Sequence, residues 1–415
     1  MNKNIAFYTT PDTMEPLFPN DPSGLLENLA IELIKRSSML SGTMNPITRM
    51  AIANFLRPMN SYYSNLIEGH DTHPIDINNA LNKDFSKDRT KRNLQLEAHA
   101  HIKVHESIFK EIKKDGSEII PSSTDYIKKI HEKFYNHLPE DFKKVTSKEG
   151  EIKDVVPGEI RNSEVEVGKH IAPHSNHLDS FTDRFESFYN PNSNDNKQLT
   201  TRIISIAASH HRLAWIHPFI NGNGRVVRLY SDACFIYEDL DSSGLWSISR
   251  GLARTNSIYK AKLANSDLKR QGDYDGRGNL SNKMLIEFCA YFLETAIDQI
   301  NYMYKVIDVD KMINRLKRFS ELMVLKNKLK PGAEFILVDV FLKGKISKSE
   351  AMRITNKSDK TLKILTDSLI KLGLLTSKKE GISMMYYVNY PITFSPMIFP
   401  GLYPSDKEID MMNIA

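Results

Sequence analysis

The chain has 415 residues, of which 40% are apolar and 26% are charged, and its formal net charge is +5. This length exceeds one ordinary domain and predicts two to three folded units. The composition is typical of a soluble globular protein that can bury apolar cores, whereas the small positive charge neither requires nor excludes a nucleic-acid partner.

The chain contains two cysteines, Cys234 and Cys289, and each lies in an apolar segment of helical pattern. We therefore expect buried free thiols, and this cysteine usage excludes a disulfide scaffold. The first residues lack the continuous apolar run of a secretory signal. No segment approaches the ~18 apolar residues of a membrane span. We expect a cytoplasmic protein without a membrane partner.

Residues 1–23 are rich in proline and predict an arm on the surface. Helical periodicity and start or stop signals then predict helices at residues 25–34, 44–57, 61–70, 90–114, 122–137, 199–216, 222–240, 282–305 and 306–328. Residues 145–178 differ, because glycines and prolines flank a stretch in which valine and glutamate alternate. That alternation predicts a short hairpin with one face toward solvent.

The last folded unit begins after Lys330-Pro331-Gly332 and spans residues 331–390. Ser347 to Glu350 predict a capping box before one helix, Ser358 begins a second, and two strand-like segments follow. This order resembles a winged helix-turn-helix, in which Lys357, Lys360 and Lys363 would contact DNA from the start of the recognition helix. The alternative is a solvated face on a wing that docks a protein or forms a homo-oligomer.

These patterns divide the chain into five segments. They are an N-terminal arm with helices (1–95), a core (96–305), a helical connector (306–330), the winged unit (331–390) and a C-terminal tail (391–415).

The stretch HPFINGNGRVVR, residues 217–228, combines a potential base, a bend and two cations. Its Asn-Gly-Asn-Gly run predicts a turn into a helix, whose free backbone N–H groups bind anions. Arg225 and Arg228 are three positions apart, so we expect them on one side of the first turn, holding a polyphosphate. His217 can take a proton near neutral pH, which suits attack by a hydroxyl on a bound phosphate. A glycine-rich bend with surface arginines and a capping histidine is the alternative.

This stretch closely resembles the signature of Fic proteins, His-x-Phe-x-Asp/Glu-Gly-Asn-Gly-Arg-x-x-Arg. Residues 157–174 look like the flap of that family and residues 246–267 look like its following helices, so the resemblance covers about residues 60–300. It implies a mostly helical core with a β-hairpin flap. It also implies transfer of AMP from ATP to a hydroxyl of a protein.

The resemblance gives each matched residue a role. His217 would be the general base, and Phe219 would anchor the loop in the core. The nucleotide would be bound by Gly222, Asn223, Gly224, Arg225, Arg228, Tyr259 and Asp267, of which the last two fall where family members contact adenine. Pyrophosphate would leave on a magnesium ion. The family's metal ligand is Asp or Glu, and Asn221 stands there instead, so metal binding should be weaker.

The flap implied by the resemblance consists of Val165, Glu166, Val167, Gly168, Lys169 and His170. An exposed strand edge can pair with an extended segment of a target protein. Such pairing would bring a Tyr, Thr or Ser hydroxyl against His217. An ordinary surface hairpin is the alternative.

A second pattern, Ser64-Asn65-Leu66-Ile67-Glu68-Gly69, resembles the inhibitory motif Ser/Thr-x-x-x-Glu-Gly/Asn of the subclass with an N-terminal inhibitory helix. Ser64, Glu68 and Gly69 are its matching positions. Glu68 at a helix C-terminus opposes the helix dipole, which makes sense if a cation such as Arg228 pairs with it. That pair would keep Arg228 from the γ-phosphate of ATP.

The function that we expect is therefore autoinhibited adenylylation of a target protein or of the chain itself. Two alternatives stay open. One is a DNA-binding regulator that uses the core as a nucleotide-sensing module, and the other is an enzyme that mainly removes AMP, with Glu68 positioning a water.

Overall fold

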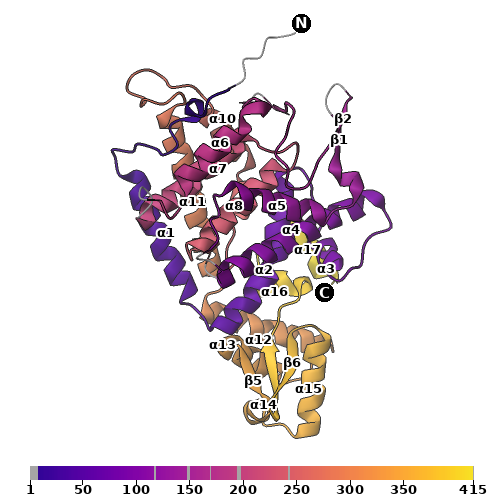
Figure 1. Ribbon diagram of the computed structural model, residues 1–415. Helices are drawn as coiled ribbons and strands as arrows, with labels where there is room; N and C mark the ends of the chain where they lie inside the picture. Colours follow the sequence, from indigo (N-terminus) through magenta and orange to yellow (C-terminus); the bar gives the residue numbers. More distant parts are fainter. Residues whose placement is uncertain are drawn as a thin grey trace.

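The computed structural model of the protein describes residues 8–115, 118–146, 150–168, 170–193, 198–241 and 244–414. A helical body comes first, and a smaller unit with a three-stranded sheet follows it (Figure 1). The last helices of the chain return from that unit to the body.

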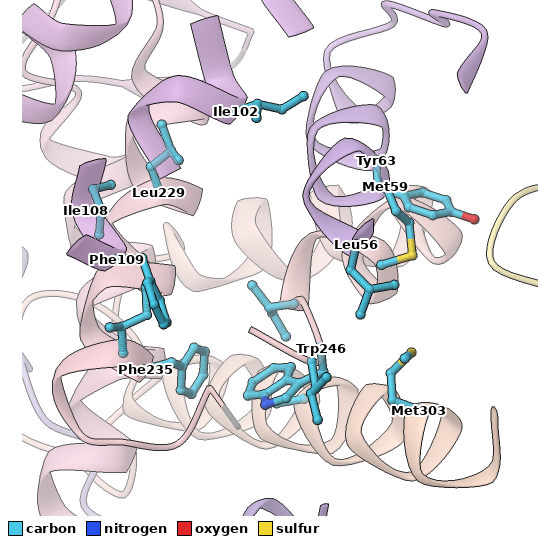
Figure 2. Close-up of a cluster of buried hydrophobic side chains, with 14 of the residues drawn as sticks. Leu56, Met59, Tyr63, Ile102, Ile108, Phe109, Leu229, Phe235, Trp246 and Met303 are labelled. Atoms are coloured by element: carbon cyan, nitrogen blue, oxygen red, sulfur yellow. The ribbon is translucent and has the colours of Figure 1, made fainter. Parts of the chain in front are cut away.

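The body is built from helices that pack around one apolar core. They are α1 (Leu25–Ser41), α2 (Pro46–Ile67), α3 (Pro74–Leu81), α4 (Arg89–Asp115), α5 (Thr124–Asn136), α6 (Leu178–Tyr189), α7 (Leu199–Ile216), α8 (Asn223–Tyr237), α9 (Ile248–Arg254), α10 (Asn256–Ser266) and α11 (Asn282–Val306). Figure 2 shows part of this core, where side chains of α2, α4, α8 and α11 meet. Both cysteines are free and buried, as predicted. Within the described ranges no helix is long and apolar enough to cross a membrane.

Helix α2 corrects one sequence prediction, because residues 44–57 and 61–70 belong to one continuous helix that runs through Pro58. Proline inside a helix removes one hydrogen bond and usually kinks or ends the helix. Here Phe55, Met59, Tyr62 and Tyr63 recur at helical spacing and are buried on both sides of the proline. Their tertiary packing stabilises the helix beyond its local propensity. Glu68 therefore stands at the end of a helix that the core holds in place.

Helices α7 and α8 meet at the predicted bend. Helix α7 ends at Ile216, and His217 takes a left-handed conformation with φ of 50°. Gly222, with φ of 81°, then precedes the first residue of α8. Pro218 explains why the helix cannot continue, since the residue before a proline avoids the helical region.

Two small antiparallel hairpins connect α5 to α6. The first pairs β1 (Lys144–Thr146) with β2 (Ile152–Asp154). The second pairs β3 (Glu166–Val167) with β4 (His170–Ile171), so the predicted short hairpin is present. Lys169 of the predicted flap lies outside the described residues, as do the side chains of Glu166 and Val167.

The C-terminal unit contains the two helices and the two strands that the sequence predicts, and it adds one helix and a third strand. The predicted elements are α14 (Lys348–Thr355), α15 (Asp359–Lys371), β6 (Leu375–Glu380) and β7 (Ser383–Val388), the additions are α13 (Ala333–Lys343) and β5 (Lys345–Ser347), and α12 (Val309–Leu325) connects the unit to the body. The strands form an antiparallel sheet in the order β5-β7-β6. The predicted capping box between Ser347 and Glu350 is present. The interpretation of the whole C-terminal unit as a winged helix-turn-helix that binds DNA stays a prediction.

The end of the chain packs on α2, which sequence analysis did not anticipate. It contains α16 (Ser395–Ile398) and α17 (Ser405–Ile414). The Tyr63 hydroxyl of α2 donates to the Leu402 carbonyl at 2.8 Å. The Lys407 ammonium lies 3.0 Å from the Asp71 carboxylate, just beyond the end of α2.

Candidate active site

A cavity of about 370 Å³ lies where α2, α7, α8, α10 and the β3–β4 hairpin converge. It brings together several residues that the sequence assigns to the site from distant segments. Its lining consists of Ile67, Glu68, His170, His211, Ala214, Trp215, His217, Asn223, Gly224, Val227, Arg228, Tyr259, Lys260, Leu263 and Asp267. Asn221, Gly222 and Arg225 are outside this lining.

His217 is held as a neutral base at the edge of this cavity. Its Nδ1 lies 3.4 Å from the Ala214 carbonyl oxygen, which can only accept a hydrogen bond. The proton therefore belongs on Nδ1, and Nε2 keeps its lone pair. Burial, together with the nearby charge of His170, lowers the pKa of His217 to about 3. The Arg161 guanidinium donates to the His217 carbonyl at 2.9 Å and fixes the backbone at this point.

The bend after His217 is closed by side chains that fold back onto its own backbone. The Asn223 side chain accepts from the Phe219 N–H at 3.0 Å and donates to the Phe219 carbonyl at 2.7 Å. A Cβ at Gly222 would lie 3.0 Å from the Tyr135 ring, so this position requires glycine for both space and positive φ. The bend thus directs the free N–H groups of the first turn of α8 toward the cavity, where they can bind an anion.

His131 of α5 supports the same bend, and sequence analysis missed it. Its Nδ1 accepts from the Gly158 N–H at 2.9 Å, so its Nε2 carries the proton and donates to the Asn221 carbonyl at 3.2 Å. Its ring stacks on Phe219, with centroids 4.0 Å apart. Phe219 is 1% exposed, in agreement with its predicted role as the anchor of the loop. The histidine could not be found from spacing, because it reaches the bend only through the packing of α5.

The two arginines of α8 both act on Glu68 but have different hydrogen-bonding partners. Positions three apart on an α-helix are only about 60° apart around the axis, so the two side chains begin on the same side and their partners then direct the guanidinium groups to different neighbours. Arg228 extends toward α2, where it donates to Ser64 Oγ and to the Ser64 carbonyl, both at 3.0 Å. Arg225 extends toward α4, where its guanidinium lies 3.0 Å from the buried carboxylate of Glu97 and 3.0 Å from His70 Nδ1.

The predicted contact between Glu68 and Arg228 is present. Their carboxylate and guanidinium are 2.7 Å apart, and Arg228 is 1% exposed. A Cβ at Gly224 would overlap the Glu68 carboxylate, which therefore rests against the first turn of α8. Burial alone would raise the pKa of Glu68, but the charges of Arg228 and Arg225 hold it below its ordinary value. An anionic side chain thus occupies the anion-binding end of the helix. Gly69, with φ of 87°, follows the end of α2.

Tyr259 and Asp267 both line the cavity, where other side chains engage their polar atoms. The Tyr259 hydroxyl pairs with His210 Nε2 at 2.8 Å. The Asp267 carboxylate lies 3.2 Å from His170 Nδ1 and 3.1 Å from His211 Nε2. Burial opposes the charge of Asp267, but these two histidine contacts keep its pKa well below the ordinary range.

The described residues of the site provide few ligands for a bound metal ion. Asn221 stands where the resemblance implies a metal ligand, and its side chain does not line the cavity. Throughout the described part of the chain, no three His, Cys, Asp or Glu side chains gather in a way that could hold a metal. The residues therefore fit a bound magnesium ion poorly.

Residues 121–234, which include α5, the hairpins, α7 and most of α8, match the family model described as the Fic/DOC family. The chain contains a Fic domain. Over 80 residues it is 37% identical to the protein adenylyltransferase Fic of Drosophila melanogaster and 38% identical to that of Culex quinquefasciatus. These alignments cover 19% of this chain and 16% and 15% of the two relatives. The chain thus matches about a sixth of the length of these curated relatives.

Solved structures extend the likeness beyond the Fic domain. A Fic family protein from Desulfovibrio desulfuricans aligns with 90% of this chain and 98% of its own, with a TM-score of 0.52 and 13% identity. A Fic domain containing signaling protein from Bacteroides thetaiotaomicron aligns with 67% of this chain and 97% of its own, with a TM-score of 0.51 and 17% identity. At these identities the likeness concerns the fold alone. The predicted, mostly helical Fic fold is confirmed.

Proposed function

We propose that the chain is an autoinhibited protein adenylyltransferase, which transfers AMP from ATP to a Tyr, Thr or Ser hydroxyl of a target protein or of itself. One observation carries this proposal. The unprotonated His217 Nε2 belongs to a residue that lines the same cavity as Arg228 and the first turn of α8. The printed name of the curated relatives, protein adenylyltransferase, supports it.

The reaction follows from this arrangement. The triphosphate of ATP would lie against the N-terminus of α8, with the γ-phosphate on Arg228 once Glu68 has left. His217 Nε2 would take the proton of the target hydroxyl, whose oxygen forms a bond to the α-phosphorus. The bond from that phosphorus to the bridging oxygen breaks, and pyrophosphate leaves. Positioning and electrostatic stabilisation would supply most of the rate.

Magnesium would accompany ATP as part of the substrate. Because the residues fit a resident metal poorly, we assign it no step. A neutral base is compatible with this scheme near neutral pH, since the pKa of His217 is about 3.

The β3–β4 hairpin is the proposed docking edge for the target. Among the strands that the structure describes, β3 and β4 pair only with each other. Each strand therefore keeps one edge at which an extended segment could add by main-chain hydrogen bonds. Docking there would bring a hydroxyl toward the cavity that His170 and His217 share.

Glu68 is the proposed brake. Its carboxylate holds Arg228 and rests against Gly224, so it competes with the phosphates for both groups. Removing the carboxylate should open the productive position for ATP. If the chain instead removes AMP, Glu68 would position the attacking water, and its loss would lower activity.

The test is intact mass spectrometry after incubation with ATP and magnesium, alone and with an extract of the native host. The Glu68→Gly variant should add one AMP unit to itself or to proteins of the extract. Introducing His217→Ala into this variant should abolish the transfer. His177→Gln, at an exposed histidine away from the cavity, is the matched control. No AMP transfer by the folded Glu68→Gly variant would overturn the proposal. Loss of AMP from premodified proteins in the presence of the wild type would favour the reverse reaction.

A second candidate function concerns the C-terminal unit, which we propose binds DNA. Lys357, Lys360 and Lys363 are all exposed near the start of α15, where a recognition helix would present them. Fluorescence anisotropy of labelled duplexes from the host genome should show binding that weakens with salt. Lys360→Glu with Lys363→Glu should reduce it, whereas Lys317→Glu on α12 should not. Equal effects of both changes would contradict this role.

A further inference from the structure

Asp267 lies at the C-terminal end of α10 and joins two elements that are far apart in the sequence. One carboxylate oxygen lies 3.2 Å from His170 Nδ1 of strand β4, and the other lies 3.1 Å from His211 Nε2 of α7. All three residues line the cavity. The carboxylate is therefore a direct connection between the β3–β4 hairpin and the helix that precedes the base.

The hydrogen-bond partners of the two rings identify their roles. His211 Nδ1 accepts from the Arg212 guanidinium at 2.6 Å, so its Nε2–H donates to Asp267. His170 Nε2 lies 2.7 Å from the Trp215 carbonyl oxygen, and its Nδ1 faces the carboxylate. Both neighbours of His170 are acceptors, so only the doubly protonated ring satisfies both contacts. The His170 ring of the hairpin is thus held by a carboxylate on α10 and by the backbone two residues before His217.

The same corner of the molecule is closed from outside by the N-terminal arm. The Tyr8 ring lies 4.9 Å from the Trp215 ring, centroid to centroid, and the His170 ring lies 5.7 Å from it. The Tyr8 carbonyl accepts from the His174 N–H at 2.9 Å, just after β4. Asp267 is therefore engaged inward by two histidines in a corner that aromatic rings enclose.

We propose that Asp267 is a positioning residue that latches the β3–β4 hairpin, through His170, in the orientation that presents a target hydroxyl to His217. This assignment rests on the proposed function for its consequence, and it replaces the contact with adenine that the resemblance implies for this position. Both carboxylate oxygens already have histidine partners, so the latch needs no nucleotide to form. Its loss should affect docking of the protein target and leave binding of ATP intact.

The first test is hydrogen–deuterium exchange of the whole chain, which reports local opening without any need for activity. Asp267→Asn keeps the shape of the side chain and removes its charge. Because charge-assisted hydrogen bonds are among the strong ones, exchange of the β3 and β4 amides should become about tenfold faster or more. Asp267→Glu should restore most of the protection. Asp273→Asn, in the exposed loop that follows α10, is the matched control and should leave exchange in the hairpin unchanged. Unchanged exchange in Asp267→Asn would overturn the latch.

The second test separates docking from nucleotide binding in the Glu68→Gly background. Soluble protein of the host extract is titrated at saturating labelled ATP, and the Kd of ATP is measured by calorimetry. Asp267→Asn and His170→Gln should each raise the half-saturating extract concentration about tenfold or more, and the double variant should be no worse than the worse single one. The Kd of ATP should change by less than about twofold.

A rise in the Kd of ATP without a change in half-saturation would assign Asp267 to the nucleotide and overturn the proposal. Additive effects of the two substitutions would also contradict it, because residues that act through one contact cannot lose it twice. If the Glu68→Gly background transfers no AMP at all, the proposed function fails, whereas the exchange measurement still decides whether the latch exists.

Discussion

Replacing Glu68 by glutamine separates the charge of the proposed brake from its volume. Glutamine keeps an oxygen that can accept from Arg228 and keeps the bulk that rests against Gly224. It loses the negative charge that occupies the N-terminus of α8. The Glu68→Gly variant loses charge, acceptor and bulk together. The structure therefore predicts graded release, in which Glu68→Gln is intermediate between the wild type and Glu68→Gly.

The contact with Arg228 indicates how large the first step should be. A charge-assisted hydrogen bond is roughly twice as strong as a neutral one, whose net contribution is about 1 kcal/mol. The two therefore differ by about 1 kcal/mol, and this is an upper value because the Glu68 side chain is 34% exposed and solvent screens its charge. That corresponds to about a fivefold higher rate of AMP transfer for Glu68→Gln. The further increase in Glu68→Gly then measures the acceptor and the bulk.

The assay is the initial rate of transfer from labelled ATP, with the Kd of ATP measured in parallel by calorimetry. Thermal melting of each variant confirms that it is folded. If Glu68→Gln equals Glu68→Gly, occupation of space plays no part in the brake. If Glu68→Gln equals the wild type, the charge plays no part, and the ion pair with Arg228 is not what restrains the enzyme.

Three further outcomes follow from the buried groups. Burial lowers the pKa of His131 to about 4 and that of His217 to about 3, so the unfolded chain binds more protons as pH falls below about 6.5. The melting temperature should therefore decrease as the pH is lowered from about 7 to about 4.5. The decrease should be smaller in His131→Gln. A melting temperature of the wild type that does not change with pH would contradict the burial of these rings in their neutral form. Gly222→Ala introduces a side chain at φ of 81° and 3.0 Å from Tyr135. We expect the free energy of unfolding, measured by denaturant titration, to fall by about 1–2 kcal/mol and AMP transfer to be lost. An unchanged unfolding midpoint would argue against strain in the bend of the variant. Tyr403→Ala removes a side chain that is 3% exposed and lies beside α2. The same titration should show a free energy of unfolding that is about 3–5 kcal/mol lower. A decrease below ~1 kcal/mol would show that the C-terminal segment is not packed on the body in solution.

Local patterns were sufficient to predict the bend and the contact between Glu68 and Arg228. A proline after His217 and glycines before α8 restrict the backbone itself, so the break between α7 and α8 follows from a few adjacent residues. The contact of Glu68 with Arg228 could be expected because a short motif and a long motif occur in one chain. In both cases the determining residues are close in sequence or belong to a resemblance with fixed positions.

Contacts that depend on tertiary packing could not be predicted in the same way. Arg225 turns toward α4 because a buried carboxylate, Glu97, is there, and no spacing in the sequence relates the two residues. Helix α2 continues through Pro58 because the core buries both of its halves, which overrides the local preference for a break. The two histidines that contact the Asp267 carboxylate come from other segments, and no spacing in the sequence relates them to it.

The most direct test of the central claim is a crystal structure of the Glu68→Gly variant with ATP. We expect the triphosphate against the first turn of α8, the γ-phosphate on the Arg228 guanidinium, and His217 Nε2 on the side of the α-phosphorus from which a hydroxyl can attack. ATP bound outside this cavity, or bound with the imidazole of His217 directed away from the α-phosphorus, would contradict the account.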